Sequence, residues 1–293
     1  MPTKLPILRL TERDYDLLDA LGDYRFLSVP QAAALFFPSA GSAARRLREL
    51  VAAKLALPVF LPVRPWTRAS ETVYALAGKG AVLLAPRHNG LRPRHLTARE
   101  QRSGLFLEHT LRRNDVRIAF DLLQLGRSDF TQFAWQQNPD QVRASAVVKL
   151  GVRTEARVPI VPDGVALVRI GGQHHVLAIE IDMGTVPVVR MWRRYRAYWK
   201  WWRLGGPRLR YGPVPYRVLT LVPDEKRLKA LAAVAARAPE NRSRGSRLFW
   251  FATLDAADIT TPQKIIGAVW RPATEPLSPP EPLFPPERAT LAA

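Results

Sequence analysis

The stretch VPDGVALVRIGGQHHVLAIEIDMGT, residues 161–185, decides the fold of the second half of the chain. It holds two apolar, β-prone runs joined by Gly171 and Gly172. Both central positions of a tight two-residue hairpin turn need positive φ, which glycine adopts without strain. The stretch therefore predicts an antiparallel hairpin, with His174 and His175 exposed beside its turn.

The turn also predicts the register of the hairpin. A two-residue loop places Ile170 opposite Gln173, and counting outward in equal steps places Asp163 opposite Glu180. Because side chains alternate between the faces of a sheet, Asp182 shares a face with Glu180. A loop longer by two residues would leave all three carboxylates on that face. The apolar residues between them predict a sheet that is covered on both sides.

Clustered carboxylates repel one another, so a bound cation, protonation or arginines must neutralise them. Oxygen ligands without cysteine suit Mg²⁺ or Mn²⁺, and such a site can cleave phosphodiesters. The predicted metal ligands and catalytic residues are Asp163, Glu180 and Asp182. In the alternative arrangement, Asp163 and Asp182 are exposed turn residues and Glu180 is paired with an arginine.

A basic and aromatic helix is predicted after the hairpin, in VVRMWRRYRAYWKWWRLGG, residues 188–206. No acidic residue occurs between Asp182 and Asp224. We expect the aromatic side chains to pack on the sheet while basic ones contact phosphates. The predicted DNA contacts of this helix are Arg190, Arg193, Arg194 and Lys200.

Helical and strand-like segments alternate from residue 103 to 271, which predicts an α/β (α+β) domain there. Its first helix carries His109 on the inner stripe, where the imidazole is either a core residue or a catalytic partner of the carboxylates. The prolines of residues 272–293 predict a disordered or extended tail.

The first 86 residues predict a winged helix-turn-helix domain. A helix follows Thr11 and stops at Gly22, Ser28 caps a second helix, and a third runs from Ser39 to Lys54. Two β-prone runs, residues 59–63 and 71–76, complete the order of three helices and a hairpin. Residues 87–102 are polar and predict a linker.

The third helix has a basic side opposite its core side. We expect it to lie in the major groove, with Ser42, Arg45, Arg46 and Arg48 on phosphates and base edges. Arg64 and Arg68, between the two β-prone runs, would contact the flanking backbone as a wing. The alternative is a protein-binding winged helix with solvated arginines.

Composition supports a nucleic-acid partner. The 293 residues include 44 Lys and Arg against 25 Asp and Glu, a net charge of +19. Such an excess favours double-stranded DNA through counterion release, over a merely basic protein or one on an anionic membrane surface. Cysteine is absent, which excludes zinc fingers. Without a signal peptide or a long apolar run, we expect a cytoplasmic protein.

Several motifs together resemble the replication-relaxation family of plasmids and integrative elements. They are an LxHxL segment around His109, the VPDG that contains Asp163, and an ExDxGT element formed by Glu180, Asp182, Gly184 and Thr185. The resemblance implies a C-terminal domain similar to the PD-(D/E)xK restriction endonucleases. It also implies a part in replication, relaxation or transfer of mobile elements, with replication or transfer proteins as partners.

One departure from the nuclease pattern affects the predicted chemistry. Asp182 stands where such a nuclease carries lysine, so Arg194 or Lys200 would have to replace the missing amine, and arginine is a poor base. The leading hypothesis is therefore a DNA-binding protein whose nuclease-like domain does not have to cut. The alternatives are an Mg²⁺-dependent endonuclease or nickase and a transcription regulator.

Overall fold

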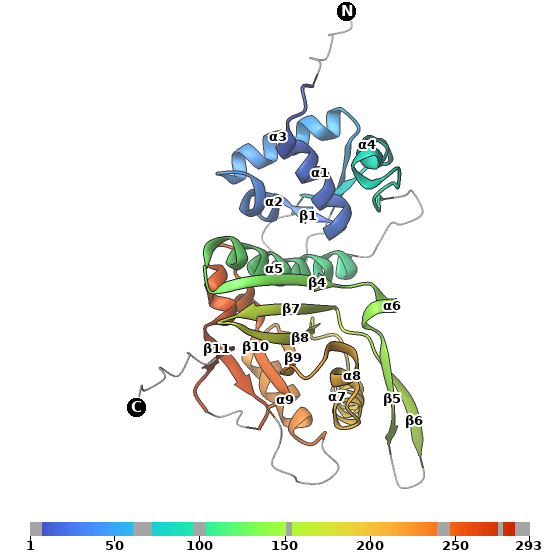
Figure 1. Cartoon of the computed structure of the whole chain (residues 1–293), viewed down its shortest axis with the longest axis vertical. Coiled ribbons are helices and arrows are strands. Elements are labelled where there is room, and N and C mark those ends of the chain that lie inside the picture. The colour runs from blue at the N-terminus through green and yellow to red at the C-terminus, as the bar shows by residue number, and fades with distance from the viewer. Residues whose placement is uncertain are drawn as a thin grey trace, which may run out of the picture. The chain divides into compact units, whose positions relative to one another are not determined.

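A computed structural model describes residues 8–60, 72–96, 104–150, 154–238, 247–274 and 278–284. The fold is mixed α/β, as predicted, with a large mixed sheet (Figure 1). The chain divides into two compact units, residues 1–118 and 119–293. The division lies inside the long helix α5 (Gly104–Gly126), which we expected to belong entirely to the second domain.

The N-terminal unit has the predicted order of three helices and a hairpin. Its elements are α1 (Glu12–Tyr24), β1 (Leu27–Ser28), α2 (Val29–Phe36), α3 (Ala40–Ala52), β2 (Ala56–Phe60) and β3 (Thr72–Leu76). β3 pairs with both β1 and β2, giving an antiparallel sheet in the order β1-β3-β2. Gly22 does not stop α1, which continues to Tyr24, and the glycine is buried.

Reciprocal caps explain where the second helix begins. The backbone amide of Gln31 donates to the Ser28 hydroxyl, and the Ser28 amide donates to the Gln31 side chain at 3.1 Å. This capping box satisfies donors that a helix start leaves unpaired. Gln31 also donates to the Leu111 carbonyl of α5 at 2.9 Å, so the same residue fastens the beginning of α5 to α2.

Two short helices that the sequence did not reveal follow the hairpin. They are α4 (Gly78–Leu84) and a 3₁₀ helix (Ala85–His88), and the second overlaps the start of the predicted linker. Gly80 allows α4 to approach the strands, because a Cβ there would lie 2.3 Å from the Leu55 carbonyl oxygen. Asn114 of α5 donates to the Phe26 carbonyl at 2.7 Å, so this part of α5 belongs to the N-terminal core.

The C-terminal unit is built on a seven-stranded sheet in the order β12-β11-β10-β9-β8-β7-β4. Its strands are β4 (Phe130–Gln136), β7 (Gly164–Ile170), β8 (Gln173–Ile181), β9 (Tyr216–Val222), β10 (Phe249–Thr253), β11 (Ala268–Pro272) and β12 (Glu281–Pro282). β8, β9 and β10 are parallel, joined through α7 (Val188–Arg203) and α9 (Glu225–Ala236). Further helical segments are α6 (Pro139–Val142), α8 (Gly206–Tyr211) and the 3₁₀ turns Leu254–Ala257 and Pro262–Ile266.

The β7–β8 hairpin has the predicted register. Ile170 pairs with Gln173, and the turn residues Gly171 and Gly172 have φ values of 53° and 75°. The last ladder pair is Gly164 with Ile179, so the next residues outward, Asp163 and Glu180, are opposite one another. The prediction from the Gly-Gly turn is confirmed.

Both faces of this sheet are covered, as the apolar strands predicted. Met191, Tyr195 and Tyr198 of α7 belong to one core with residues of β8, β9 and α9. On β4, the Phe133 ring stacks on Phe120 of α5, with 5.5 Å between ring centroids. The carboxylates on the α7 side therefore lie beneath a helix rather than in open solvent.

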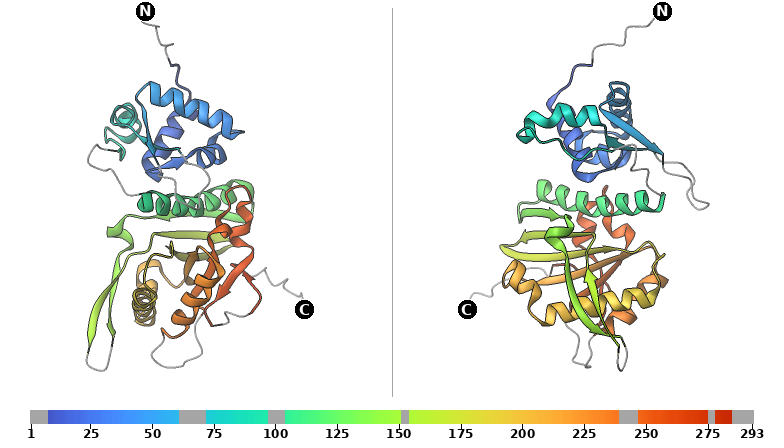
Figure 2. Two further views of the ribbon diagram at one scale, coloured as in Figure 1. Left: turned by 180° about the vertical axis from the view of Figure 1, so that it is seen from behind. Right: turned by 90° about the vertical axis from the view of Figure 1, so that its right-hand side faces the viewer.

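An additional hairpin between β4 and β7 was missed by the sequence prediction. β5 (Ala144–Lys149) and β6 (Glu155–Ile160) pair with each other as a separate two-stranded sheet. Figure 1 and the left view of Figure 2 show it leaving the main sheet as an arm beside α7. Its buried residues, including Val148 and Ile160, join the α7 core.

Within the part of the chain predicted to be a disordered or extended tail, the structure describes a short strand. β12 pairs with β11, and Leu283 is fully buried with its amide bonded to the Ile266 carbonyl. The Phe284 ring lies 4.7 Å from the ring of His175. His175 is consequently buried, in contrast to the exposure expected beside the turn.

Candidate functional site

Helix α3 separates core residues from basic ones. Ala43, Leu47 and Leu50 are fully buried, whereas Arg45 and Arg48 are exposed. Neither arginine forms a hydrogen bond or ion pair with any residue in the described ranges. The two guanidinium groups are therefore available to an anionic ligand.

Arg46, which we expected to contact DNA, is engaged inside the protein. Its guanidinium donates to both carboxylate oxygens of Asp14, at 2.7 Å and 2.6 Å, and to Glu49 at 2.6 Å. Burial disfavours ionisation of Asp14, but the hydrogen bonds from Arg46 and Thr11 outweigh it and lower the pKa of this carboxyl. Arg46 thus holds α3 to α1, and its contact with DNA stays a prediction.

Ser42 also has a local structural role. Its amide and hydroxyl form hydrogen bonds with Ser39, the residue that caps α3. Its contact with DNA stays a prediction. Arg64 and Arg68, predicted on the wing, lie outside the described residues.

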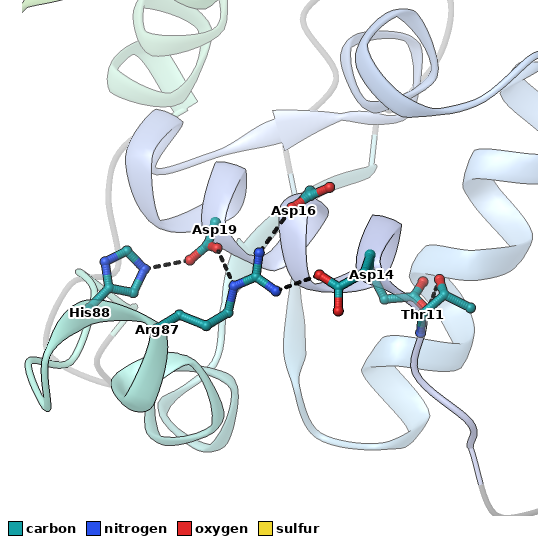
Figure 3. Close-up of polar contacts among 7 residues, drawn as sticks. Thr11, Asp14, Asp16, Asp19, Arg87 and His88 are labelled. Carbon is teal, nitrogen blue, oxygen red and sulfur yellow. Dashed lines mark hydrogen bonds and ion pairs between the residues drawn. The ribbon is translucent and has the colours of Figure 1, made fainter.

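Acidic residues of α1 are neutralised from the 3₁₀ helix after α4 (Figure 3). Arg87 forms ion pairs with Glu12, Asp16 and Asp19, at distances of 2.8 Å to 3.6 Å. His88 lies 2.6 Å from Asp19. Arg87 and His88 therefore neutralise acidic residues of α1 within the protein, whereas Arg45 and Arg48 of α3 are exposed.

The carboxylate site lies at the end of β8. Asp163 forms hydrogen bonds to this strand through both its backbone and its side chain. Its amide donates to the Ile179 carbonyl at 2.9 Å, and its Oδ2 accepts a hydrogen bond from the Ile181 amide at 2.7 Å. Glu180 is almost completely buried. Burial raises the pKa of Glu180, and the nearby charge of Asp163 adds to this rise.

Glu180 is held by two side chains of α7. Arg194 donates to its Oε2 at 2.6 Å, and the Tyr198 hydroxyl donates to its Oε1 at 2.7 Å. Burial raises the pKa of Glu180 above its usual range, while the positive charge of Arg194 opposes this rise. Arg194 is therefore the counter-ion of Glu180, and its contact with phosphate stays a prediction. Tyr198 was missed, although its position four residues after Arg194 puts both on one side of the helix.

Asp182 belongs to a different ion pair. Arg227 of α9 donates to both of its oxygens, at 2.7 Å and 3.0 Å. The Gly184 amide adds a hydrogen bond at 3.2 Å, with Gly184 at a φ of 76°. No local sequence signal reveals Arg227, since it lies 45 residues further along the chain. The predicted cluster is thus divided between two arginines.

These residues do not fit a metal ion in the observed arrangement. Both oxygens of Glu180 and both of Asp182 already accept hydrogen bonds from other side chains. Across the described residues, no three His, Asp or Glu side chains are grouped as metal ligands. A divalent ion such as Mg²⁺ or Mn²⁺ would have to displace the guanidinium of Arg194 or Arg227 from its carboxylate.

The other predicted contacts of α7 differ in exposure. Arg190 and Arg193 are exposed, and Lys200 is half-buried. Most of the aromatic residues face the core: Tyr195 and Tyr198 are fully buried there, whereas Trp192 lies under the guanidinium of Arg196. This agrees with the expected division of the helix into an aromatic inner side and a basic outer side.

Comparison with protein families identifies the relatives of this chain. The model of the family described as replication-relaxation matches residues 18–215, more than half of the sequence. The chain belongs to the replication-relaxation family. No curated protein and no solved structure matches it.

Replication-relaxation family membership indicates a role in the replication of plasmids or other mobile elements. The matched span includes α3, the β7–β8 hairpin and α7, and so contains both the exposed arginines and the carboxylates. In the described ranges, no helix has the length and apolar character needed to cross a bilayer.

His109 of this replication-relaxation protein lies on α5 within the N-terminal unit, and its side chain is half-buried. The carboxylates lie in the C-terminal unit. A catalytic partnership between His109 and the carboxylates therefore stays a prediction.

Proposed function

We propose that this protein binds double-stranded DNA during plasmid or mobile-element replication, and that its N-terminal unit is the winged helix-turn-helix that recognises the duplex. One observation carries the proposal: Arg45 and Arg48 are exposed on α3 and have no partner in the described part of the chain. Three helices followed by a hairpin are the arrangement in which the third helix can enter the major groove.

Charge chemistry favours DNA as the ligand of α3. Arginine binds phosphate and guanine edges through paired hydrogen bonds. Arg45 and Arg48 are three residues apart, so both project from neighbouring positions on one side of the helix. Arg46, between them, is turned inward to Asp14. The helix is thereby anchored by one arginine while two others meet the ligand.

We propose that the C-terminal unit holds DNA and does not cut it. Its mixed sheet agrees with the restriction-endonuclease-like domain implied by the family resemblance. However, the acids that a nuclease would use for a metal are paired with Arg194 and Arg227. We propose that these ion pairs attach α7 and α9 to the end of β8 and make the site structural.

Duplex binding tests the proposal directly. The double variant Arg45→Ala/Arg48→Ala should weaken binding to a fluorescein-labelled duplex of mixed sequence, measured by anisotropy. The matched control is Lys79→Ala/Arg92→Ala, which removes the same charge from exposed residues without partners in the described ranges. Equal affinities of the two variants would refute a specific role for α3.

A second candidate function is a DNA nickase, favoured by the position of Asp163 opposite Glu180. Supercoiled plasmid incubated with Mg²⁺ or Mn²⁺ separates the two candidates. Nicking that is abolished by both Asp163→Ala and Glu180→Ala, but not by Asp129→Ala in an exposed ion pair, would establish an enzyme. Retained DNA binding without any nicking by the wild type supports the binding protein.

A further inference from the structure

A line of basic side chains follows the outer side of α7 and continues into α8. Its members on α7 recur at steps of three or four residues, so these lie along one side of that helix. We call these residues the α7 cationic line: Arg193, Arg196, Lys200 and Arg203 of α7, with Arg208 of α8.

Four of the five members of the α7 cationic line have no counter-charge in the part of the chain that the structure describes. Arg193, Lys200, Arg203 and Arg208 form no ion pair or hydrogen bond with residues that the structure describes. Arg196 lies over the Trp192 ring, 4.9 Å from its centroid. Asp182 and Asp224 are the nearest acids along the chain on either side, and Asp182 is bound to Arg227.

Helix α9 shows a different arrangement in the same unit. Its exposed cations Lys226 and Lys229 lie within four residues of Glu225, and the exposed Arg237 follows the last residue of the helix. Like charges one turn apart on a helix repel one another and destabilise it. The α7 cationic line accumulates such repulsion without neighbouring acids, and a polyanion would remove it.

We infer that the α7 cationic line binds the sugar-phosphate backbone of duplex DNA without reading its sequence. The inference rests on the proposed function and adds to it a second contact, on the C-terminal unit. From Arg193 to Arg203 the helix rises about 15 Å at about 1.5 Å per residue. Phosphates along one strand of B-DNA repeat about every 3.4 Å along its axis, so the line is long enough to meet several of them.

An anionic membrane is the other polyanion to consider, because Leu204 and Leu209 are exposed near the end of the line. A helix that lies on a membrane inserts its apolar side among the lipids. The apolar side of α7 is instead buried: Tyr195, Ala197 and Tyr198 belong to the core of the unit. The observations therefore favour DNA.

The test removes three charges from the line in one variant, and in another it removes two from α9 and one from Arg237, the residue that follows α9. The line variant is Arg193→Gln/Lys200→Gln/Arg203→Gln, and the matched control is Lys226→Gln/Lys229→Gln/Arg237→Gln. Affinity for a mixed-sequence duplex is measured in the full chain as salt is raised. The slope of log K against log salt is negative, and each lost phosphate contact reduces its magnitude by about 0.9. For the line variant we therefore expect the magnitude of the slope to fall by up to about 2.7. The control should retain the wild-type slope.

Equal slopes for the two variants would overturn the inference, because the effect would then come from net charge alone. A line variant with the same salt slope as the wild type would overturn the inference as well. Binding to phosphatidylserine vesicles that is lost only in the line variant, with DNA binding intact, would assign the line to a membrane instead. If Arg45→Ala/Arg48→Ala weakens DNA binding while the line variant does not, only this inference fails and the proposed function stands.

Discussion

Replacing Arg46 by alanine should destabilise the N-terminal unit strongly, while replacing its neighbour Arg45 should not. The Asp14 side chain is completely buried, and Arg46 donates to both of its oxygens. Removing the arginine leaves a buried carboxylate without its counter-ion, which typically costs about 3–5 kcal/mol. The half-exposed pair with Glu49 adds little to this, below about 1 kcal/mol.

Hydrogen exchange followed by mass spectrometry measures this loss within one unit of the full chain. A cost of about 3–5 kcal/mol corresponds to about two to four powers of ten in the protection of amides that exchange by opening of the unit. The affected amides should be those of α1 and α3. Arg45→Ala, on the same helix, should leave their protection almost unchanged because its side chain is exposed.

A second substitution checks that the buried charge causes the loss. Adding Asp14→Asn to Arg46→Ala removes the unpaired carboxylate, so the double variant should be more stable than the sum of the single changes predicts. Equal exchange in Arg46→Ala and Arg45→Ala, or strict additivity of the two changes, would refute the reasoning.

Two further predictions concern the C-terminal unit. Burial, and then the charge of Arg217, lower the pKa of His175 to about 4. The imidazole binds a proton near pH 6.5 in the unfolded state but only near pH 4 in the folded state. The free energy of unfolding should therefore fall by up to about 3 kcal/mol as pH drops from 6.5 to 4. Urea unfolding of His175→Gln should show a weaker loss over that range, and an identical pH profile would contradict the assignment. Gly164→Ala should cost about 1–3 kcal/mol, because its Cβ would lie 2.0 Å from the Trp135 ring. Gly126→Ala, where a Cβ meets nothing within 4 Å, should not destabilise in the same urea titration, and equal midpoints for the two variants would count against the predicted clash.

Local sequence chemistry was sufficient for much of the fold. The Gly171–Gly172 turn predicted the β7–β8 register, because a two-residue loop allows few pairings. Ser28 marked the start of α2 through its cap. Apolar spacing on α3 separated Leu47 and Leu50 from the basic side. In each case the signal and the structure lie within a few residues of each other.

Partners that are distant in sequence could not be predicted in the same way. Asp14 and Arg46 are 32 residues apart, and Asp182 and Arg227 are 45 apart. Each of these arginines looks like any other basic residue until the helices pack. The sequence therefore predicted which carboxylate lies opposite Asp163, but it left open whether a metal or an arginine neutralises Glu180.

The salt dependence of duplex binding tests the central claim, that exposed arginines of α3 contact DNA, most directly. Affinity should be measured over a series of salt concentrations for the wild type and for Arg45→Ala/Arg48→Ala. The account predicts that the variant binds more weakly. It also predicts that the magnitude of the negative slope of log K against log salt falls by about 1.8, for two lost phosphate contacts. Unchanged affinity and an unchanged slope would contradict it.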